Sequence, residues 1–291
     1  MEVECVVASR SQIGEGAVWD DEDQALWWVD IPPGLIHRFD PQTGENETWD
    51  FGEPVGCLAL RARGGLVVAA KSGFYTFDPS SGHRQAIFDP EAHLPENRFN
   101  DGTTDPRGRF WAGTMKDGGD LAPQGTFYRL DPDMSVTTWR NGFYTTNGSA
   151  FSPDGSTMYF SDSNPARRTI WRAPYDLDTG RPGAPEVFLD TRDMPGRPDG
   201  GTVDADGCYW MAGVDGWQVY RITPEGKVDR TIDLPVERPS KPMFGGRERD
   251  TLYVTSLGIG LSGERPQPLA GSLFAITGLG VSGLPQTRFE G

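Results

Sequence analysis

The sequence predicts an all-β protein, a six-bladed β-propeller of four-stranded antiparallel blades. Three observations predict it: a repeat of 40 to 51 residues, short apolar runs rich in aromatic and β-branched residues, and turn sequences on both sides of these runs. Repeats of this length are typical of propellers. Helical repeats of similar length need long stretches of 3.6-residue periodicity. The chain shows none, and instead contains 38 Gly and 24 Pro.

Each repeat holds one apolar run with an anchor residue at its centre. The anchors lie 40, 44, 48, 51 and 43 residues apart, and they are Trp27, Val67, Trp111, Tyr159, Trp210 and Tyr253. A turn such as Asp105–Gly108 precedes the anchor, and a second turn such as Asp40–Gly44 follows it. Asp begins turns by bonding to the backbone ahead, and Gly accepts positive φ. Each repeat is therefore predicted to contain four strands, A to D.

The repeats determine the expected domain organisation. They fill residues 1–291, so we expect one propeller domain without a linker, although chain length alone favours two domains. A ring must join its two ends in one blade. The apolar run Val3–Ala8 precedes the first A strand, and we expect it to supply an outer strand to the last blade.

Acidic residues dominate the charge, with 42 Asp and Glu against 27 Lys and Arg, a formal net charge of −15. Nucleic acids and anionic membranes attract basic surfaces, so we expect neither as a partner. The three cysteines are far apart and imply no disulfide framework. Met1–Glu4 is acidic, with neither a signal-peptide apolar region nor an 18-residue apolar run in the chain. We expect a cytoplasmic monomer or small homo-oligomer.

One position, 11 or 12 residues before each anchor, has an unusual composition. The residues found there are Glu15, Gly56, Asn100, Asn147, Asp199 and Pro242, with Lys241 beside the last. The A strands of a propeller line its channel, so equivalent positions form a ring. Carboxylate and amide oxygens in such a ring suit a hard cation such as Ca²⁺, Mg²⁺ or Mn²⁺. Each motif alone is an ordinary turn sequence, and their shared register is what predicts a metal site.

The same motifs carry a family resemblance. Gly14–Trp19, Asn97–Gly102, Thr146–Gly148 and Pro198–Gly200 resemble the site motifs of the gluconolactonase, regucalcin (SMP-30, senescence marker protein) and sugar lactonase family. The resemblance runs over about residues 10–277. The segment Gly258–Ile276 is most similar to bacterial sugar-acid lactonases such as xylonolactonase.

The resemblance implies a single divalent metal ion near one end of the channel. Glu15, Asn147 and Asp199 match the family's ligand positions. Calcium is the first expectation, and Fe²⁺, Mn²⁺, Zn²⁺ or Mg²⁺ are the alternatives. Asn100 is implied close to the metal, where it holds a water or the substrate, and Arg98 is implied at the substrate's oxygens.

This sequence differs from the family pattern at one place. Some relatives carry a Glu that reaches the substrate a few residues after a Gly-Thr-Met motif. Here that motif, at 113–115, is followed by Lys116 and Asp117, which are the replacements that we expect to contact substrate. The aromatic residues Tyr144 and Trp217 are further candidates for contact with a sugar ring.

The expected function is hydrolysis of a sugar-acid lactone to the open aldonate. The metal would polarise the lactone carbonyl, and Asp199 would take a proton from the attacking water or serve only as a ligand. Two other functions stay open. One is hydrolysis of aryl esters or organophosphates at the same metal site, which needs a more apolar pocket. The other is a non-enzymatic calcium-binding regulator.

Overall fold

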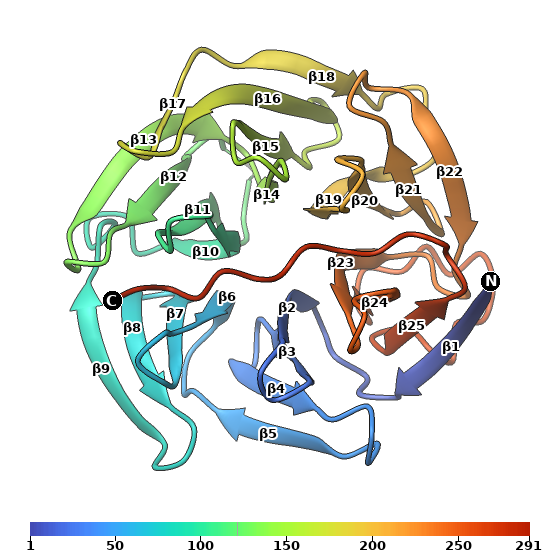
Figure 1. Ribbon diagram of the computed structural model, residues 1–291, viewed down its shortest axis with the longest axis horizontal. Helices are drawn as coiled ribbons and strands as arrows, with labels where there is room; N and C mark the ends of the chain where they lie inside the picture. Colours follow the sequence, from blue (N-terminus) through green and yellow to red (C-terminus); the bar gives the residue numbers. More distant parts are fainter. Residues whose placement is uncertain (121) are drawn as a thin grey trace.

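The computed structural model describes residues 1–120 and 122–291, which form 25 strands in six antiparallel sheets around a central axis (Figure 1). The predicted fold class, an all-β six-bladed propeller, is confirmed. Helices are absent from this described part of the chain, so it contains no helix that could cross a membrane.

The two inner strands of each blade are almost entirely buried. The A strands, which line the axis, are β2 (Gly14–Asp20), β6 (Val55–Leu60), β10 (Asn97–Thr104), β14 (Thr146–Phe151), β19 (Arg197–Val203) and β23 (Pro239–Gly245). The B strands are β3 (Ala25–Asp30), β7 (Leu66–Ala70), β11 (Phe110–Lys116), β15 (Thr157–Asp162), β20 (Tyr209–Val214) and β24 (Thr251–Ser256). Every anchor residue lies on a B strand, so the sequence repeat corresponds to the blade.

The outer half of each blade is more exposed. The C strands are β4 (Leu35–Phe39), β8 (Gly73–Asp78), β12 (Gly125–Leu130), β16 (Thr169–Asp176), β21 (Gln218–Ile222) and β25 (Leu273–Thr277). The D strands are β5 (Asn46–Asp50), β9 (His83–Phe88), β13 (Val136–Phe143), β18 (Glu186–Asp190), β22 (Val228–Asp233) and β1 (Glu2–Val7). The fourth blade has an additional short strand, β17 (Arg181–Pro182), beside β16. Pro182 and Pro185 lack an N–H, which interrupts the outer ladder there.

The predicted turns form between the strands. In the A–B turns, the N–H groups of Gly108 and Gly207 donate to the carbonyls of Asp105 and Asp204, both at 2.9 Å. These glycines have φ of 73° and 84°, in the left-handed region where a side chain is strained. The regular spacing of Asp and Gly within the sequence repeat therefore has a backbone cause in both of these hairpins.

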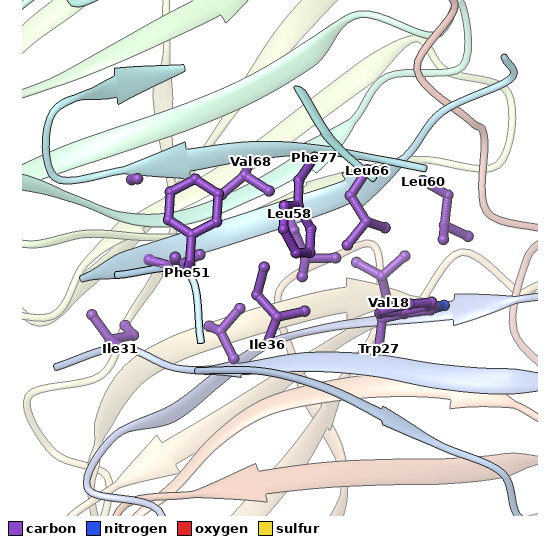
Figure 2. Packing of buried hydrophobic residues seen from close by; sticks show 13 residues of the cluster. Val18, Trp27, Ile31, Ile36, Phe51, Leu58, Leu60, Leu66, Val68 and Phe77 are labelled. Carbon is purple, nitrogen blue, oxygen red and sulfur yellow. The ribbon is translucent and has the colours of Figure 1, made fainter. Parts of the chain in front are cut away.

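Apolar side chains fill the space between neighbouring blades. Figure 2 shows the cluster between the first and second blades, in which Trp27 and Ile36 face Leu58, Val68 and Phe77. All of these residues are buried. Complete burial of one such side chain contributes about 1.5–3 kcal/mol, so the interfaces between blades hold the ring together.

The two ends of the propeller meet in the sixth blade. Strand β1 pairs antiparallel with β25, with Glu2 opposite Thr277 and Cys5 opposite Phe274. The half-buried side chains of Val3 and Cys5 pack against the apolar cluster of that blade. The first strand of the chain, β1, is therefore the outer strand of the blade that also contains the last strand, β25.

Deletion of residues 1–9 is expected to remove most of the free energy of unfolding, which for a domain is about 5–15 kcal/mol. The deletion uncovers the edge of β25 and opens the ring. Urea unfolding followed by tryptophan fluorescence measures the effect. A Glu2→Ser/Glu4→Ser variant, which changes only exposed side chains of β1, is the control. A deletion variant as stable as the control would contradict this role of β1.

A segment after β25 crosses the middle of the ring, as Figure 1 shows in red. The amide of Ala205 donates to the carbonyl of Ser282 at 2.8 Å, and the amide of Phe289 donates to that of Leu60 at 2.7 Å. Phe289 is fully buried among apolar residues of the second and third blades. These contacts lie at the carboxyl ends of A strands, so the segment covers one end of the channel. The sequence repeat does not predict the position of this segment.

His37 is buried within the first blade, which agrees with a structural role. Its ring stacks on Trp28 at a centroid distance of 3.9 Å, and its Nδ1 lies 3.0 Å from the hydroxyl of Thr48. Burial lowers the pKa of His37 to about 4. The unfolded chain therefore binds a proton between about pH 6.5 and pH 4 that the folded chain does not.

This difference predicts a loss of stability as the pH falls through that window. His37 should account for about 3 kcal/mol between pH 7 and pH 4. Denaturant unfolding of the parent protein and of His37→Phe at both pH values isolates the contribution, since Phe does not titrate. If the two proteins lost the same amount of stability, the protonation of His37 would be irrelevant to folding.

Candidate metal and substrate site

The amino ends of the A strands surround a polar hollow of about 180 Å³ at the end of the channel opposite the C-terminal segment. It is lined by Ile13, Glu15, Arg98, Asn100, Met115, Thr145, Asn147, Ser163, Arg197, Asp199, Val214, Arg238 and Leu257. Pockets for drug-sized ligands start at about 300 Å³, so this hollow suits a smaller molecule. All four acidic or amide residues of the predicted ring line it.

Irregularities in the A strands present these side chains to the hollow. The pairing of β2 with β3 shifts register between Glu15 and Val18, and β14 shifts between Asn147 and Ala150. Such bulges turn a side chain out of the regular alternation of a strand. Gly16 has a φ of 61°, and its N–H donates to Oε2 of Glu15 at 2.8 Å. The glycine after Glu15 therefore serves the local backbone turn.

A chain of hydrogen bonds joins four residues from three blades. Arg98 donates from Nη1 to Oδ1 of Asn100 at 2.8 Å, and Asn100 donates from Nδ2 to Oδ1 of Asn147 at 3.0 Å. Asn147 then donates from Nδ2 to Oδ1 of Asp199 at 2.6 Å. All four side chains are at least nine-tenths buried. The network fixes their positions at the base of the hollow.

The two carboxylates of the hollow lack full compensation by hydrogen bonds. Oε1 of Glu15 is buried without a hydrogen-bond partner among the described residues. Burial, followed by the charges of Asp199 and Asp101, raises the pKa of Glu15 well above its ordinary value. Burial raises the pKa of Asp199 to about 7. A buried unpartnered carboxylate oxygen is costly, and a cation beside it removes that cost.

The donor chemistry fits a hard divalent cation. Within residues 1–120 and 122–291, no three His, Cys, Asp or Glu side chains gather into a metal-binding group. The hollow instead offers two carboxylates and the amide of Asn147, an oxygen set of the kind that Ca²⁺ and Mg²⁺ accept. In the structure, Nδ2 of the Asn147 amide points toward Asp199. A half-turn of the amide about its terminal bond would present Oδ1 there.

The predicted substrate residues divide into two groups. Arg98 and Asn100 line the hollow, and Asp117 reaches it through Arg98, with its Oδ1 at 3.2 Å from Nε. Lys116, at the end of β11, is half-buried and does not line it. Tyr144 and Trp217 also lie outside. The guanidinium of Arg167 covers the ring of Tyr144, and that of Arg265 covers the ring of Trp217.

Four polar residues of the hollow were not predicted, namely Thr145, Ser163, Arg197 and Arg238. Ser163 accepts a hydrogen bond from Nδ2 of Asn147 at 2.6 Å, and Arg197 and Arg238 line the wall beside Asp199. Arg197 directly precedes the Pro-Asp-Gly motif, and this position could have identified it from the sequence as a residue of the site. Ser163 and Arg238 lie just outside strand ends, where no repeated pattern marks them.

A buried ion pair crosses the channel beneath the hollow. Nζ of Lys241, on β23, lies 2.8 Å from Oδ1 of Asp101, on β10. The side chain of Lys241 is 2% exposed and that of Asp101 is fully buried. Oδ2 of Asp101 accepts a hydrogen bond from the amide of Ser149 at 3.1 Å. The pair joins the third and sixth blades, which face each other across the axis.

The fold and the hollow define a six-bladed propeller with an oxygen-rich site at one end of its channel. The chain belongs to the SMP-30/gluconolactonase/LRE-like family, whose model matches residues 13–258. The resemblance predicted from the sequence motifs is thereby confirmed.

Individual relatives match along their whole length. A 6-deoxy-6-sulfogluconolactonase from Pseudomonas putida is 38% identical over 297 residues, which cover 99% of both chains. Regucalcin from Xenopus laevis is 35% identical over 300 residues, covering 100% of this chain and 99% of its own. The crystal structure of regucalcin from Agrobacterium tumefaciens, described as a calcium-binding protein, has a TM-score of 0.92 at 28% identity, covering 98% of this chain and 96% of its own.

Proposed function

We propose that the protein hydrolyses a sugar-acid lactone to the open aldonate with the help of one divalent cation. The observation that carries this proposal is the convergence of Glu15, Asn147 and Asp199 in one small polar hollow. A relative covering 99% of the chain is named as a sulfogluconolactonase, which supports a lactone substrate. The polar lining also favours a sugar over an aryl ester, since three arginines contribute to it.

Glu15, Asn147 and Asp199 would hold the cation, with calcium the first candidate. A relative of known structure is described as a calcium-binding protein, which supports this choice. When bound, a divalent cation supplies Lewis-acid polarisation of a carbonyl oxygen. A half-turn of the Asn147 amide toward the cation would exchange its present hydrogen bonds with Asn100 and Asp199 for a contact from Oδ1 to the ion.

Arg98 and Asn100 would orient the lactone. Nε of Arg98 is held by Asp117, and its Nη1 is held by Asn100 and by the carbonyl of Phe99 at 2.9 Å. Nη2 of Arg98 makes no hydrogen bond to the described residues and is available to a substrate hydroxyl. Fixing the guanidinium in advance reduces the entropy lost when the lactone binds.

Asp199 would accept the proton of the attacking water. Its Oδ1 receives the hydrogen bond from Asn147, whereas Oδ2 accepts none from the described residues. The water oxygen bonds to the carbonyl carbon as its proton passes to Asp199. The bond between that carbon and the ring oxygen then breaks, and the proton returns to the ring oxygen as a hydroxyl. The products are the aldonate and a proton released to solvent.

A pH-indicator assay with a lactone panel tests this function. The panel holds xylono-, galactono-, arabinono- and gluconolactone together with phenyl acetate, with spontaneous hydrolysis subtracted. Turnover of a sugar lactone after a divalent ion is restored to chelator-treated protein supports the proposal. Turnover of phenyl acetate alone would favour an esterase. Calcium binding without turnover of any ester would favour a calcium-binding regulator instead.

A further inference from the structure

Two arginines on the wall of the hollow share a single carboxylate. Nη2 of Arg197 lies 2.6 Å from Oδ2 of Asp215, and Nε of Arg238 lies 2.8 Å from Oδ1 of the same side chain. Both arginines line the hollow, and their side chains are 18% and 15% exposed. Two positive charges therefore stand against one negative charge at this wall.

The remaining charges of the site do not cancel this excess. Arg98 is paired with Asp117, and the charges of Glu15 and Asp199 equal that of one divalent cation. The neighbouring Glu237 does not line the hollow, and its carboxylate accepts hydrogen bonds from Ser262 and Gln267. The loaded site therefore keeps one positive charge beside the bound ion, in a chain whose net charge is −15.

The hydrogen bonds of the two arginines leave donors available to a ligand. Nη1 of Arg238 donates to the carbonyl of Ile259 at 2.7 Å, and Nη1 of Arg197 donates to that of Ser163 at 2.7 Å. Nη2 of Arg238 donates to no residue in the described part of the chain. A guanidinium held by one hydrogen bond from Nη1 and by the ion pair of Nε with Asp215 presents such a group in a preferred direction, which suits a carboxylate, sulfonate or phosphate.

We propose that Arg238, supported by Arg197, forms a subsite for an anionic substituent carried by the lactone at a distance from its carbonyl. This proposal rests on the proposed lactonase function and names the class of lactone that the site prefers. The substituent would fill the place where the positive charge of the wall lacks a counterion. A neutral sugar lactone leaves that charge without a partner and is the poorer substrate.

Two lactones with the same ring test the subsite: glucono-1,4-lactone, which is neutral, and glucaro-1,4-lactone, which carries a terminal carboxylate. The measured quantity is the ratio of kcat/KM for the anionic lactone to kcat/KM for the neutral one. The parent protein should favour the anionic lactone, and Arg238→Met should lower the ratio by about 10- to 100-fold, the loss expected for one charge-assisted hydrogen bond.

Asp215→Asn should change the ratio in the opposite direction, because it adds a positive charge to the same wall. Arg172→Met is the control, since Arg172 lies on β16 and pairs with the exposed Glu186. If the protein hydrolysed the neutral lactone and the ratio of the two kcat/KM values were the same in the parent and in all variants, the subsite would be overturned. The lactonase function would then remain in place. A fall of the ratio in both Arg238→Met and Asp215→Asn would also overturn the subsite. Failure of the parent protein to hydrolyse either lactone would remove both proposals together.

Discussion

Asp199→Asn is expected to lower kcat/KM for the preferred lactone by about 100- to 10,000-fold. Asp199 has two proposed tasks, because its carboxylate holds the cation and accepts the proton of the attacking water. The amide of Asn keeps the shape of the side chain but accepts no proton at neutral pH. The hydrogen bond from Nδ2 of Asn147 to Oδ1 of residue 199 remains possible, so the fold should be preserved.

The companion variant Glu15→Gln separates the two tasks of Asp199. Glu15 has the ligand role alone, so Glu15→Gln should weaken binding of the cation and recover most of kcat when the metal is saturating. Asp199→Asn should stay slow at saturating metal, because the proton acceptor is absent. Calorimetry gives the metal Kd of each variant, and initial rates at rising metal concentration give kcat. If saturating metal restored both variants equally, Asp199 would be a ligand only.

Lys241→Met is expected to destabilise the fold by about 3–5 kcal/mol. The substitution leaves the carboxylate of Asp101 buried with a single hydrogen bond, from the amide of Ser149. Isolated charges are disfavoured in such an environment far more than paired ones. Equilibrium urea unfolding at pH 7 measures the loss, provided that the transition has two states.

The double variant Lys241→Met/Asp101→Asn tests the cause of that loss. It removes both charges, and a buried ion pair replaced by neutral groups of similar size costs little. The double variant should therefore be more stable than Lys241→Met alone. Arg107→Met, which removes an exposed ion pair with Asp178, should change the stability by less than about 1 kcal/mol. A double variant less stable than Lys241→Met would show that packing, and not charge, sets the loss.

The repeat made most of the fold predictable. The anchors, such as Trp27 and Trp210, occupy one place in each blade because every blade needs the same buried B strand. Structural features that occur in only one place leave no repeating pattern in the sequence. The split outer strand near Pro182 depends on local sequence, and the segment that contains Phe289 depends on apolar contacts with blades far away in the chain.

The candidate site was predictable to the extent that it repeats. Glu15, Asn100, Asn147 and Asp199 occupy related positions on four A strands, and the structure places all of them in one hollow. Arg238 lies outside the register, so its position follows only from the folded chain. Asp101 lies within the recognised motif Asn97–Gly102, but its ion pair joins residues 140 positions apart.

The aromatic predictions show a different limit. Tyr144 and Trp217 follow from the general use of aromatic rings at sugar sites. In the structure each ring is covered by an arginine, and neither belongs to the lining of the hollow. Composition near a motif does not say which side of a loop a ring faces, because that depends on the backbone. Trp217, for example, has a φ of 63°.

The most direct test of the metal-dependent lactonase is a stoichiometric restoration of activity. Chelator-treated protein is titrated with Ca²⁺, Mn²⁺, Mg²⁺, Zn²⁺ or Fe²⁺ while hydrolysis of the preferred sugar lactone is recorded. The proposal predicts negligible initial activity and, for a tightly bound ion, a linear rise that ends at one equivalent per chain. The same titration of Glu15→Gln should need a large excess of metal. Full activity in the metal-free protein would contradict the role assigned to Glu15, Asn147 and Asp199.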